Sequence, residues 1–250
     1  MGDDSWLRSG IGKSTPDAIT VRGRDLATEL MGQVTFTELA FLLTADRMPS
    51  PGETRLFDAA LVALADHGLT PSVLAARLTW TGATESLQGA VAAGLLGAGN
   101  VFLGVVEDTA RFLAAIRADP TEGAAERAVQ AEIAAGRRIP GLGHPVHKVE
   151  DPRTPRLYGI AEEAGIPIPH LTLLRTVAEV HAAATGKTLP INGAGVAGAA
   201  FADLGFPPTI VRGFALLART AGLVGHLAEE MEHPIGHRLW LDVEHRATPM

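Results

Sequence analysis

A segment near the middle of the chain gathers residue types that bind anions and act on oxygen atoms. Residues 139–153 contain His144, His147, Lys148 and Arg153. The rest of the chain is acidic, with a formal net charge of −7, so a protein of this composition that binds an anionic substrate must concentrate its cations locally. The segment therefore favours a binding site for an anionic ligand.

Two glycines stand just before the first histidine. Gly141 and Gly143 flank Leu142, and glycine lets backbone amides approach a ligand at little steric cost. Residues 151–153, Asp-Pro-Arg, are typical of a turn that leads into the next helix. These features predict a loop that binds its ligand through backbone and side chains together.

Two other interpretations of the segment remain. It could be a solvated turn whose histidines have no function. It could also bind a metal through His144 and His147, but no carboxylate or third histidine has matching spacing nearby. We therefore expect no metal.

Composition restricts the class of protein. The chain is 46% hydrophobic and 20% charged and has no cysteine, which excludes disulfides and thiolate ligands or nucleophiles. A net charge of −7 argues against a nucleic-acid partner. No uninterrupted apolar run approaches the ~18 residues of a membrane span, and the first residues lack the pattern of a signal peptide. We expect a cytoplasmic protein without a membrane partner.

The periodicity of apolar residues predicts a mostly α fold. Apolar residues recur at helical spacing, and proline and glycine punctuate the chain between the helices. One short segment, 17–24, could form a small ribbon of strands. Helices are expected at 35–44, 51–67, 87–103, 109–116, 122–135, 156–164, 171–185, 195–203 and 209–232.

The central segment carries a family resemblance. Residues 141–148, GLGHPVHK, followed by Asp151-Pro152-Arg153, resemble the G-x-G-H-x-V-x-K/R…D-P-R signature of citrate synthases. They are also similar to the corresponding stretches of ATP-citrate lyase and citryl-CoA lyases. The resemblance implies that His144 hydrogen-bonds the reacting oxygen of oxaloacetate or citrate and that Arg153 holds a carboxylate. It also implies that one edge of the loop binds coenzyme A, with Lys148 near the phosphates. This edge, the coenzyme A lip, is made by Gly141, Leu142, Gly143, Val146, His147 and Lys148.

Further matches extend the resemblance over nearly the whole chain. Residues 21–26 and 34–39 are similar to an early segment of the family that we interpret as structural. The Asp-His-Gly at 66–68 implies that His67 binds a substrate carboxylate. Residues 218–222, ARTAG, resemble the family helix whose arginine, here Arg219, binds a second carboxylate, for which a bidentate guanidinium suits better than lysine.

The C-terminal region carries a weaker match. The family often sends an arginine from this region into the site of a neighbouring subunit, and Arg246 or Arg238 could take that role. The alternative is that the matched residues have only structural roles, as helix caps, core residues or members of surface ion pairs.

Two departures from the family pattern change the expected chemistry. In synthases a histidine that stabilises the acetyl-CoA enolate lies near the position of Phe102. This chain has no histidine there, and the lyase branch of the family also lacks it. The family's catalytic aspartate follows a segment like residues 189–193, LPING, yet this chain has Ala194 there. Asn192 and Ala194 are expected to line the thioester end with Phe102. Asp203 lies about 12 Å further along the helix and is a poor substitute.

The resemblance implies a citrate synthase-like fold with a large and a small helical domain. The whole chain would be one unit, with a small domain at 105–200 inserted into a large one at 15–104 and 201–250. The expected function is a citryl-CoA lyase or citrate synthase-like enzyme that makes or breaks the C–C bond between an acyl-CoA enolate and a 2-oxo acid. The alternative is an impaired homologue that binds CoA and polycarboxylate, because the aspartate is missing. A homodimer or larger homo-oligomer is implied.

Overall fold

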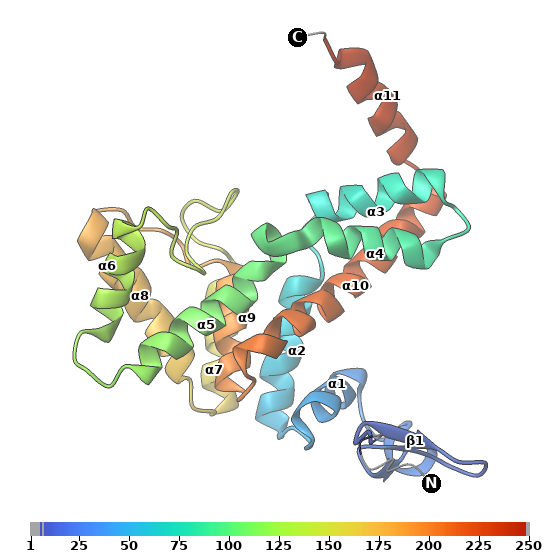
Figure 1. Cartoon of the computed structure of the whole chain (residues 1–250), viewed down its shortest axis with the longest axis horizontal. Coiled ribbons are helices and arrows are strands. Elements are labelled where there is room, and N and C mark those ends of the chain that lie inside the picture. The colour runs from blue at the N-terminus through green and yellow to red at the C-terminus, as the bar shows by residue number, and fades with distance from the viewer. Residues whose placement is uncertain (1–5, 7, 249–250) are drawn as a thin grey trace.

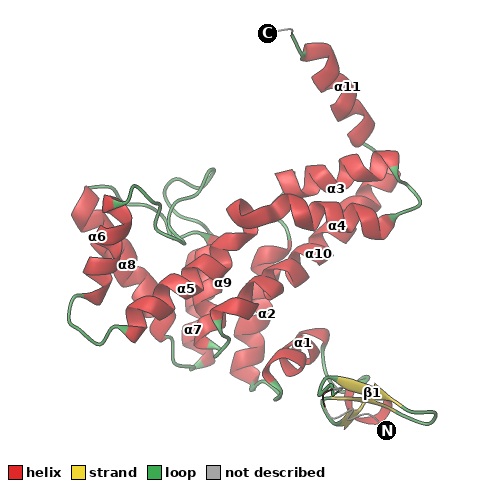
Figure 2. Ribbon diagram, viewed as in Figure 1, coloured by secondary structure: helices red, strands yellow, loops and turns green. Residues whose placement is uncertain are grey.

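A computed structural model describes Trp6 and residues 8–248. These residues form a mostly α fold in which long helices pack across one another (Figures 1 and 2). A small antiparallel sheet lies beyond α1, at the opposite end of the molecule from α11. The predicted fold class is confirmed.

The elements follow in one series along the chain. The sheet has the order β1-β2-β3, with Gly12 opposite Val21 and Val21 opposite Arg24. Of the two π-helical segments, η2 follows β3 and η3 joins α4 to α5. The bounds are β1 Gly12–Ser14, β2 Ile19–Val21, β3 Arg24–Asp25, η2 Leu26–Leu30, α1 Phe36–Ala45, α2 Pro51–Ala65, α3 Pro71–Gly82, α4 Leu87–Ala98, η3 Gly99–Leu103, α5 Gly104–Ala118, α6 Ala124–Ala134, α7 Arg153–Ala164, α8 Pro169–Thr185, α9 Gly193–Asp203, α10 Pro208–Glu232 and α11 Gly236–Arg246.

Local sequence sets where the early helices begin. The Thr35 and Ser50 side chains each accept a hydrogen bond from the backbone amide of the glutamate three residues on, and the carboxylates of Glu38 and Glu53 accept one from the cap amide. This capping box satisfies backbone donors that would otherwise lack partners. The 34–39 segment therefore has the structural role that its sequence predicted.

Helix α2 runs through the middle of the fold and packs against α7, α9 and α10, while α5 packs on α9 and α10. Phe57 of α2 is fully buried, and its ring meets those of Phe41, Phe201 and Phe214 at steep angles. Edge-to-face pairs of this kind add about 0.5–1.5 kcal/mol each beyond the burial of area. The aromatic cluster fixes the helices whose ends carry the candidate site.

Some helix boundaries differ from the predicted ones. Helix α2 ends at Ala65 rather than at residue 67, because Asp66 adopts an extended backbone and its carboxylate accepts a hydrogen bond from the amide of Gly68. The predicted helix 87–103 becomes π-helical from Gly99. Helices α3 and α11 were not predicted. The polar Ser72 and Arg77 on the buried face of α3 mask its helical pattern.

The buried cluster runs through both predicted domains without a break, so the division at 105–200 stays a prediction. Two stretches of the described chain, Leu87–Ala118 and Pro208–Glu232, are long and apolar enough to cross a membrane by length and composition. Core helices pass the same test. Both stretches pack on other helices, α4 on α3 and α10 on α2, and 33% and 39% of their apolar windows are buried.

Candidate functional site

The loop between α6 and α7 is fixed to the segment that precedes α9. Gly141 and Gly143 have φ values of +84° and +82°, in the left-handed region that glycine tolerates best. The amide of Gly143 donates to the carbonyl of Pro190 at 2.7 Å, and the side chain of Asn192 donates to the carbonyl of Gly143 at 2.9 Å. Asn192, predicted to line the pocket, therefore holds the loop in place.

Three histidines meet at the end of this loop. His67 follows α2, and its ring centroid lies 5.1 Å from that of His144 and 5.8 Å from that of His147. The rings of His144 and His147 stack with their centroids 4.4 Å apart. The structure thus brings together the two motifs, separated by more than 70 positions, that the sequence predicted to share a site.

The backbone determines which nitrogen of His144 carries the proton. Its Nδ1 accepts hydrogen bonds from the amides of Val146, at 3.1 Å, and His147, at 2.9 Å. In the neutral ring the proton is therefore on Nε2, which becomes a donor. Burial, and then the neighbouring His147, lower the pKa of His144 below its usual value. The side chain is thus a neutral donor to an oxygen atom.

The ligand nitrogens of the three histidines lie within 4.8 Å of one another, close enough to suggest a metal site. The tautomer of His144 is not compatible with binding a metal. Its Nδ1 lone pair is engaged by two amides and its Nε2 carries the proton, whereas a metal ligand needs a free lone pair. The expectation that no metal binds here stays a prediction, now with a physical reason.

Arg153 begins α7 and is held by a buried carboxylate. Its Nε and Nη2 donate to the two oxygens of Asp151, at 2.9 and 2.7 Å, and its Nη1 donates to the carbonyl of Ala63 at 3.1 Å. Burial raises the pKa of Asp151, but the hydrogen bonds from Arg153 outweigh this and lower it to about 2. A Cβ atom on Gly193 would lie only 2.2 Å from the Arg153 guanidinium, so glycine is required there.

Arg219 of α10 is a buried cation with too few partners. Arg219 is only 7% exposed, and its Nε and Nη1 atoms have no hydrogen-bond partner among the residues that the structure describes. Burial lowers the pKa of Arg219. The charges of Asp66 and Arg153 also shift this pKa, so both residues lie near the Arg219 guanidinium. Buried donors are nearly always paired, so these nitrogens point to an anionic ligand.

The end of α2 is where these groups converge. Arg153 binds the carbonyl of Ala63 there, and α10 crosses so closely that a Cβ on Gly222 would lie 2.1 Å from the carbonyl oxygen of Ala65. One turn beyond Gly222, His226 contacts Asp66, with 2.8 Å between His226 Nε2 and Asp66 Oδ1. Helices α2, α7 and α10 therefore position His67, Arg153 and Arg219 around one point.

Other predicted residues lie differently. Val146 and Lys148 are exposed, and the Lys148 ammonium donates to the carbonyl of His144 at 3.0 Å. Phe102 is 47% exposed in η3. Ala194 lies in the first turn of α9, one residue after Gly193. The roles assigned to these residues stay predictions.

Arg246 does not reach the site of its own chain. It lies on α11, which projects away from the helical body (Figure 1), and its side chain is 76% exposed and pairs with Asp242. Arg238, the alternative, belongs to the same helix. The role of either arginine in the site of a second copy stays a prediction.

A buried ion-pair network beside the site was missed. Arg77 of α3 is only 2% exposed; it donates to Glu230 at 2.9 Å, contacts Glu229, and lies 3.0 Å from His226 Nδ1. His226 in turn contacts Asp66, next to His67. The only available signal was the position of Arg77 on an otherwise apolar helix face, which is ambiguous in a sequence.

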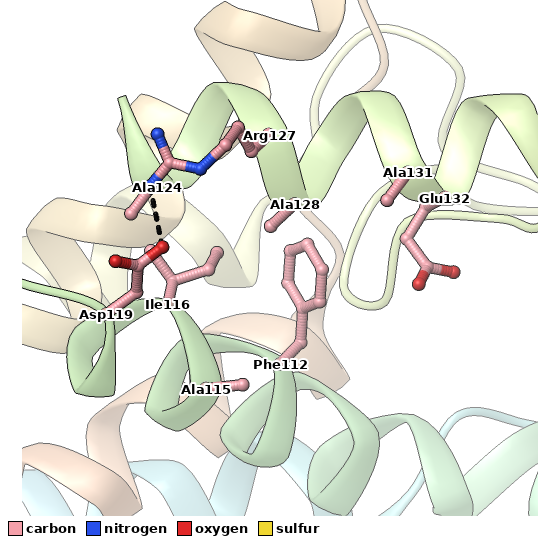
Figure 3. A pocket seen from close by; sticks show the side chains of 9 residues that line it. All are labelled: Phe112, Ala115, Ile116, Asp119, Ala124, Arg127, Ala128, Ala131 and Glu132. Atoms are coloured by element: carbon pink, nitrogen blue, oxygen red, sulfur yellow. Dashed lines mark hydrogen bonds and ion pairs between the residues drawn. The ribbon is translucent and has the colours of Figure 1, made fainter. Parts of the chain in front are cut away.

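A cavity of about 370 Å³ lies elsewhere, between α5 and α6 (Figure 3). Its lining is largely apolar, with Phe112 prominent and an ion pair between Arg127 and Asp119 at one end. None of the predicted site residues lines it. It is therefore separate from the histidine and arginine cluster.

The fold and the site define a class: a mostly α protein that gathers histidines and arginines at the ends of helices beside a glycine-containing loop. The chain belongs to the citrate synthase family, since residues 41–240 match the C-terminal domain of citrate synthase. The confirmed resemblance covers most of the chain.

Solved structures and curated relatives agree with this assignment. Citryl-CoA lyase from Hydrogenobacter thermophilus superposes with a TM-score of 0.87 at 32% identity, covering 97% of this chain and 94% of that one. ATP citrate lyase from Methanothrix soehngenii, solved with citrate and coenzyme A, gives 0.80 at 25% identity, covering 97% and 41%. Citrate synthase-like protein oryE of Aspergillus oryzae is 27% identical, covering 87% and 50%. The chain spans about half the length of oryE and of the citrate synthase from Synechocystis sp. that it also matches.

Proposed function

We propose that this chain acts on a coenzyme A thioester and a polycarboxylate. It would make or break the C–C bond between an acyl-CoA enolate and a 2-oxo acid such as oxaloacetate, as a citryl-CoA lyase-like enzyme. The likeness to citryl-CoA lyase extends over nearly the full length of both chains. The ATP citrate lyase that shares the fold was solved with citrate and coenzyme A.

The observation that carries the proposal is the state of Arg219. A guanidinium buried with two unpartnered nitrogens is costly unless a ligand completes its hydrogen bonds. Arg153 lies nearby and is held in place by Asp151. Two arginines, His67 and the neutral His144 ring suit a ligand with more than one carboxylate and a central oxygen.

Each side chain then has a role. The Nε2–H of His144 donates to the hydroxyl or carbonyl oxygen at the reacting carbon, and it stabilises negative charge that develops there. Arg153, Arg219 and His67 bind carboxylates. The loop of residues 141–148 would hold the nucleotide of the thioester, since the left-handed Gly141 and Gly143 place no side chain on it and Lys148 adds an exposed cation.

A coupled assay for oxaloacetate release from citryl-CoA tests the proposal. The wild type should release oxaloacetate, and His144→Ala should lower kcat by about 10²-fold or more, because it removes a donor aimed at the developing charge. His233→Ala, an exposed histidine after α10, is the matched control and should keep full activity. Absence of turnover that depends on His144, with every CoA thioester tried, would contradict the proposal.

The second candidate function is a homologue that binds these ligands without turnover. The observation that favours it is Ala194, in the first turn of α9 where the family has its aspartate. Loss of a positioned base costs about 10²–10⁴ in rate. This function predicts thermal stabilisation by citrate and coenzyme A without turnover. Activity created by Ala194→Asp in an otherwise inactive protein would support it.

We also propose that the chain assembles as a homodimer or larger homo-oligomer in the cytoplasm. Helix α11 projects from the body and exposes Trp240 and Val243, which a second copy would cover. Light scattering on the purified protein measures the mass. A monomeric mass across the concentration range of the activity assay would exclude a role for Arg246 in a neighbouring site.

A further inference from the structure

We propose that His147, rather than His144, takes the proton of the substrate hydroxyl during cleavage. This inference rests on the proposed function and assigns one further catalytic residue to it. The family motif leaves the position of His147 open, and the sequence alone placed it only in the coenzyme A lip.

The tautomer of His144 creates the need for another base. Amides of Val146 and His147 occupy its Nδ1, so its Nε2 carries a hydrogen and has no lone pair toward the substrate. Such a ring donates to the oxygen but cannot accept its proton. Cleavage of a tertiary alcohol to a 2-oxo acid requires that the hydroxyl proton leave.

His147 has the properties that the step requires. In the part of the chain that the structure describes, no protein group hydrogen-bonds to its ring nitrogens. The ring is half-buried and stacks on His144 with 4.4 Å between centroids. Its ligand nitrogen lies within 4.8 Å of those of His144 and His67, so one substrate oxygen can lie between His144 and His147.

Two other groups are weaker candidates. Asp203 is fully buried and accepts hydrogen bonds from the amides of His170 and Leu171 at the start of α8, so it is a helix cap. Asp151 is saturated by Arg153 and the amide of Gly193. Neither carboxylate is free to accept a proton.

The step balances without an oxidant or reductant. The hydroxyl O–H bond breaks and its proton goes to the lone pair of His147, while the O–H electron pair forms the C=O bond. The C–C bond breaks, and its electron pair goes to the thioester as an enolate. The enolate carbon takes a proton from water, and the resulting hydroxide takes the proton of the His147 imidazolium.

The titratable and charged groups near His147 come from several elements. His67 follows α2, His144 and Lys148 belong to its own loop, and Asp151 and Arg153 stand at the start of α7. A general base acts only in its unprotonated form, so kcat should rise with pH in the wild type and should lose this rise when the base is removed. A merely structural role would not produce this dependence.

The test compares His147→Gln with the wild type in the citryl-CoA assay. Glutamine keeps a polar side chain but cannot accept a proton, so kcat should fall by about 10²–10⁴-fold, and the rise of kcat with pH should disappear. Thermal stabilisation by citrate and coenzyme A should persist. Added imidazole should restore activity to His147→Ala, whereas His233→Gln should behave as the wild type.

Several outcomes would overturn the assignment. They are an unchanged kcat and pH profile in His147→Gln, loss of ligand stabilisation together with activity, or no rescue by imidazole. Nitrogen-15 NMR of the wild type gives an independent check if the variants do not fold: His144 should show a fixed Nε2–H, and His147 should show a ring nitrogen with a free lone pair. A wild type that turns over while His147→Gln is unaffected refutes this inference alone; a wild type without turnover refutes the proposed function and this inference together.

Discussion

Replacement of Arg219 by methionine should make the ligand-free protein more stable and the ligand bind more weakly. Arg219 is 7% exposed, and its Nε and Nη1 atoms have no partner. A buried donor left without a hydrogen bond costs about 1–3 kcal/mol. Methionine fills similar space without buried donors, so Arg219→Met should raise the free energy of unfolding of the free protein by about 1–3 kcal/mol.

The same change should remove the response to ligand. A carboxylate that loses its buried guanidinium loses about 3–5 kcal/mol, which corresponds to a Kd for citrate about 10²–10⁴-fold weaker. At a citrate concentration 100 times the wild-type Kd, the wild type gains about 2.7 kcal/mol, and the variant should gain almost nothing. The difference in free energy of unfolding between the two proteins should therefore narrow when citrate is added, or the wild type should become the more stable of the two.

Thermal unfolding with and without citrate measures both effects. In a chain of this size, 1 kcal/mol shifts Tm by about 2–4 °C. Arg111→Met is the control, because Arg111 lies on the surface with 52% of its side chain exposed and pairs with Glu107; its stability should change by less than about 0.5 kcal/mol. A free Arg219→Met protein less stable than the wild type by 2 kcal/mol, or one stabilised normally by citrate, would refute the reasoning.

Three further predictions concern the frame of the site. Gly193→Ala should displace the Arg153 guanidinium, which lies 2.2 Å from the added Cβ, and weaken citrate binding at least about tenfold in calorimetry; unchanged affinity would contradict this. Asp151 has a folded pKa of about 2 against 3.8, so its contribution, about 2 kcal/mol, is present above pH 4 and lost as pH falls toward 2; Asp151→Asn should reduce the loss of stability over this pH range by about 2 kcal/mol in denaturant titrations, and an undiminished loss would count against it. Phe57→Ala should cost about 3–5 kcal/mol of unfolding free energy, and a loss below 1 kcal/mol would show that the aromatic cluster is not well packed.

The sequence predicted most of the helices because their apolar spacing and caps agree. Ser50 with Glu53 and Thr35 with Glu38 mark two helix starts that the structure reproduces. Helix α3 escaped prediction because its buried face carries Arg77, whose partner Glu230 lies more than 150 positions away. No local pattern reveals such a pairing.

The site was predictable in composition but not in detail. Family resemblance brought His67 and His144 together, and the structure places their rings 5.1 Å apart. The tautomer of His144 depends on two amides of the loop, and the role of Asn192 depends on the carbonyl of Gly143. These contacts follow from the backbone conformation, which residue types alone do not specify. The unpartnered nitrogens of Arg219 likewise emerge only from packing.

A crystal structure of the protein with citrate and coenzyme A tests the central claim most directly. The account predicts one citrate whose carboxylates bind Arg153 and Arg219 and whose hydroxyl lies within hydrogen-bond distance of His144 Nε2 and His147. The nucleotide should lie along residues 141–148. Citrate bound elsewhere, with Arg219 still unpartnered beside the three histidines, would contradict the account.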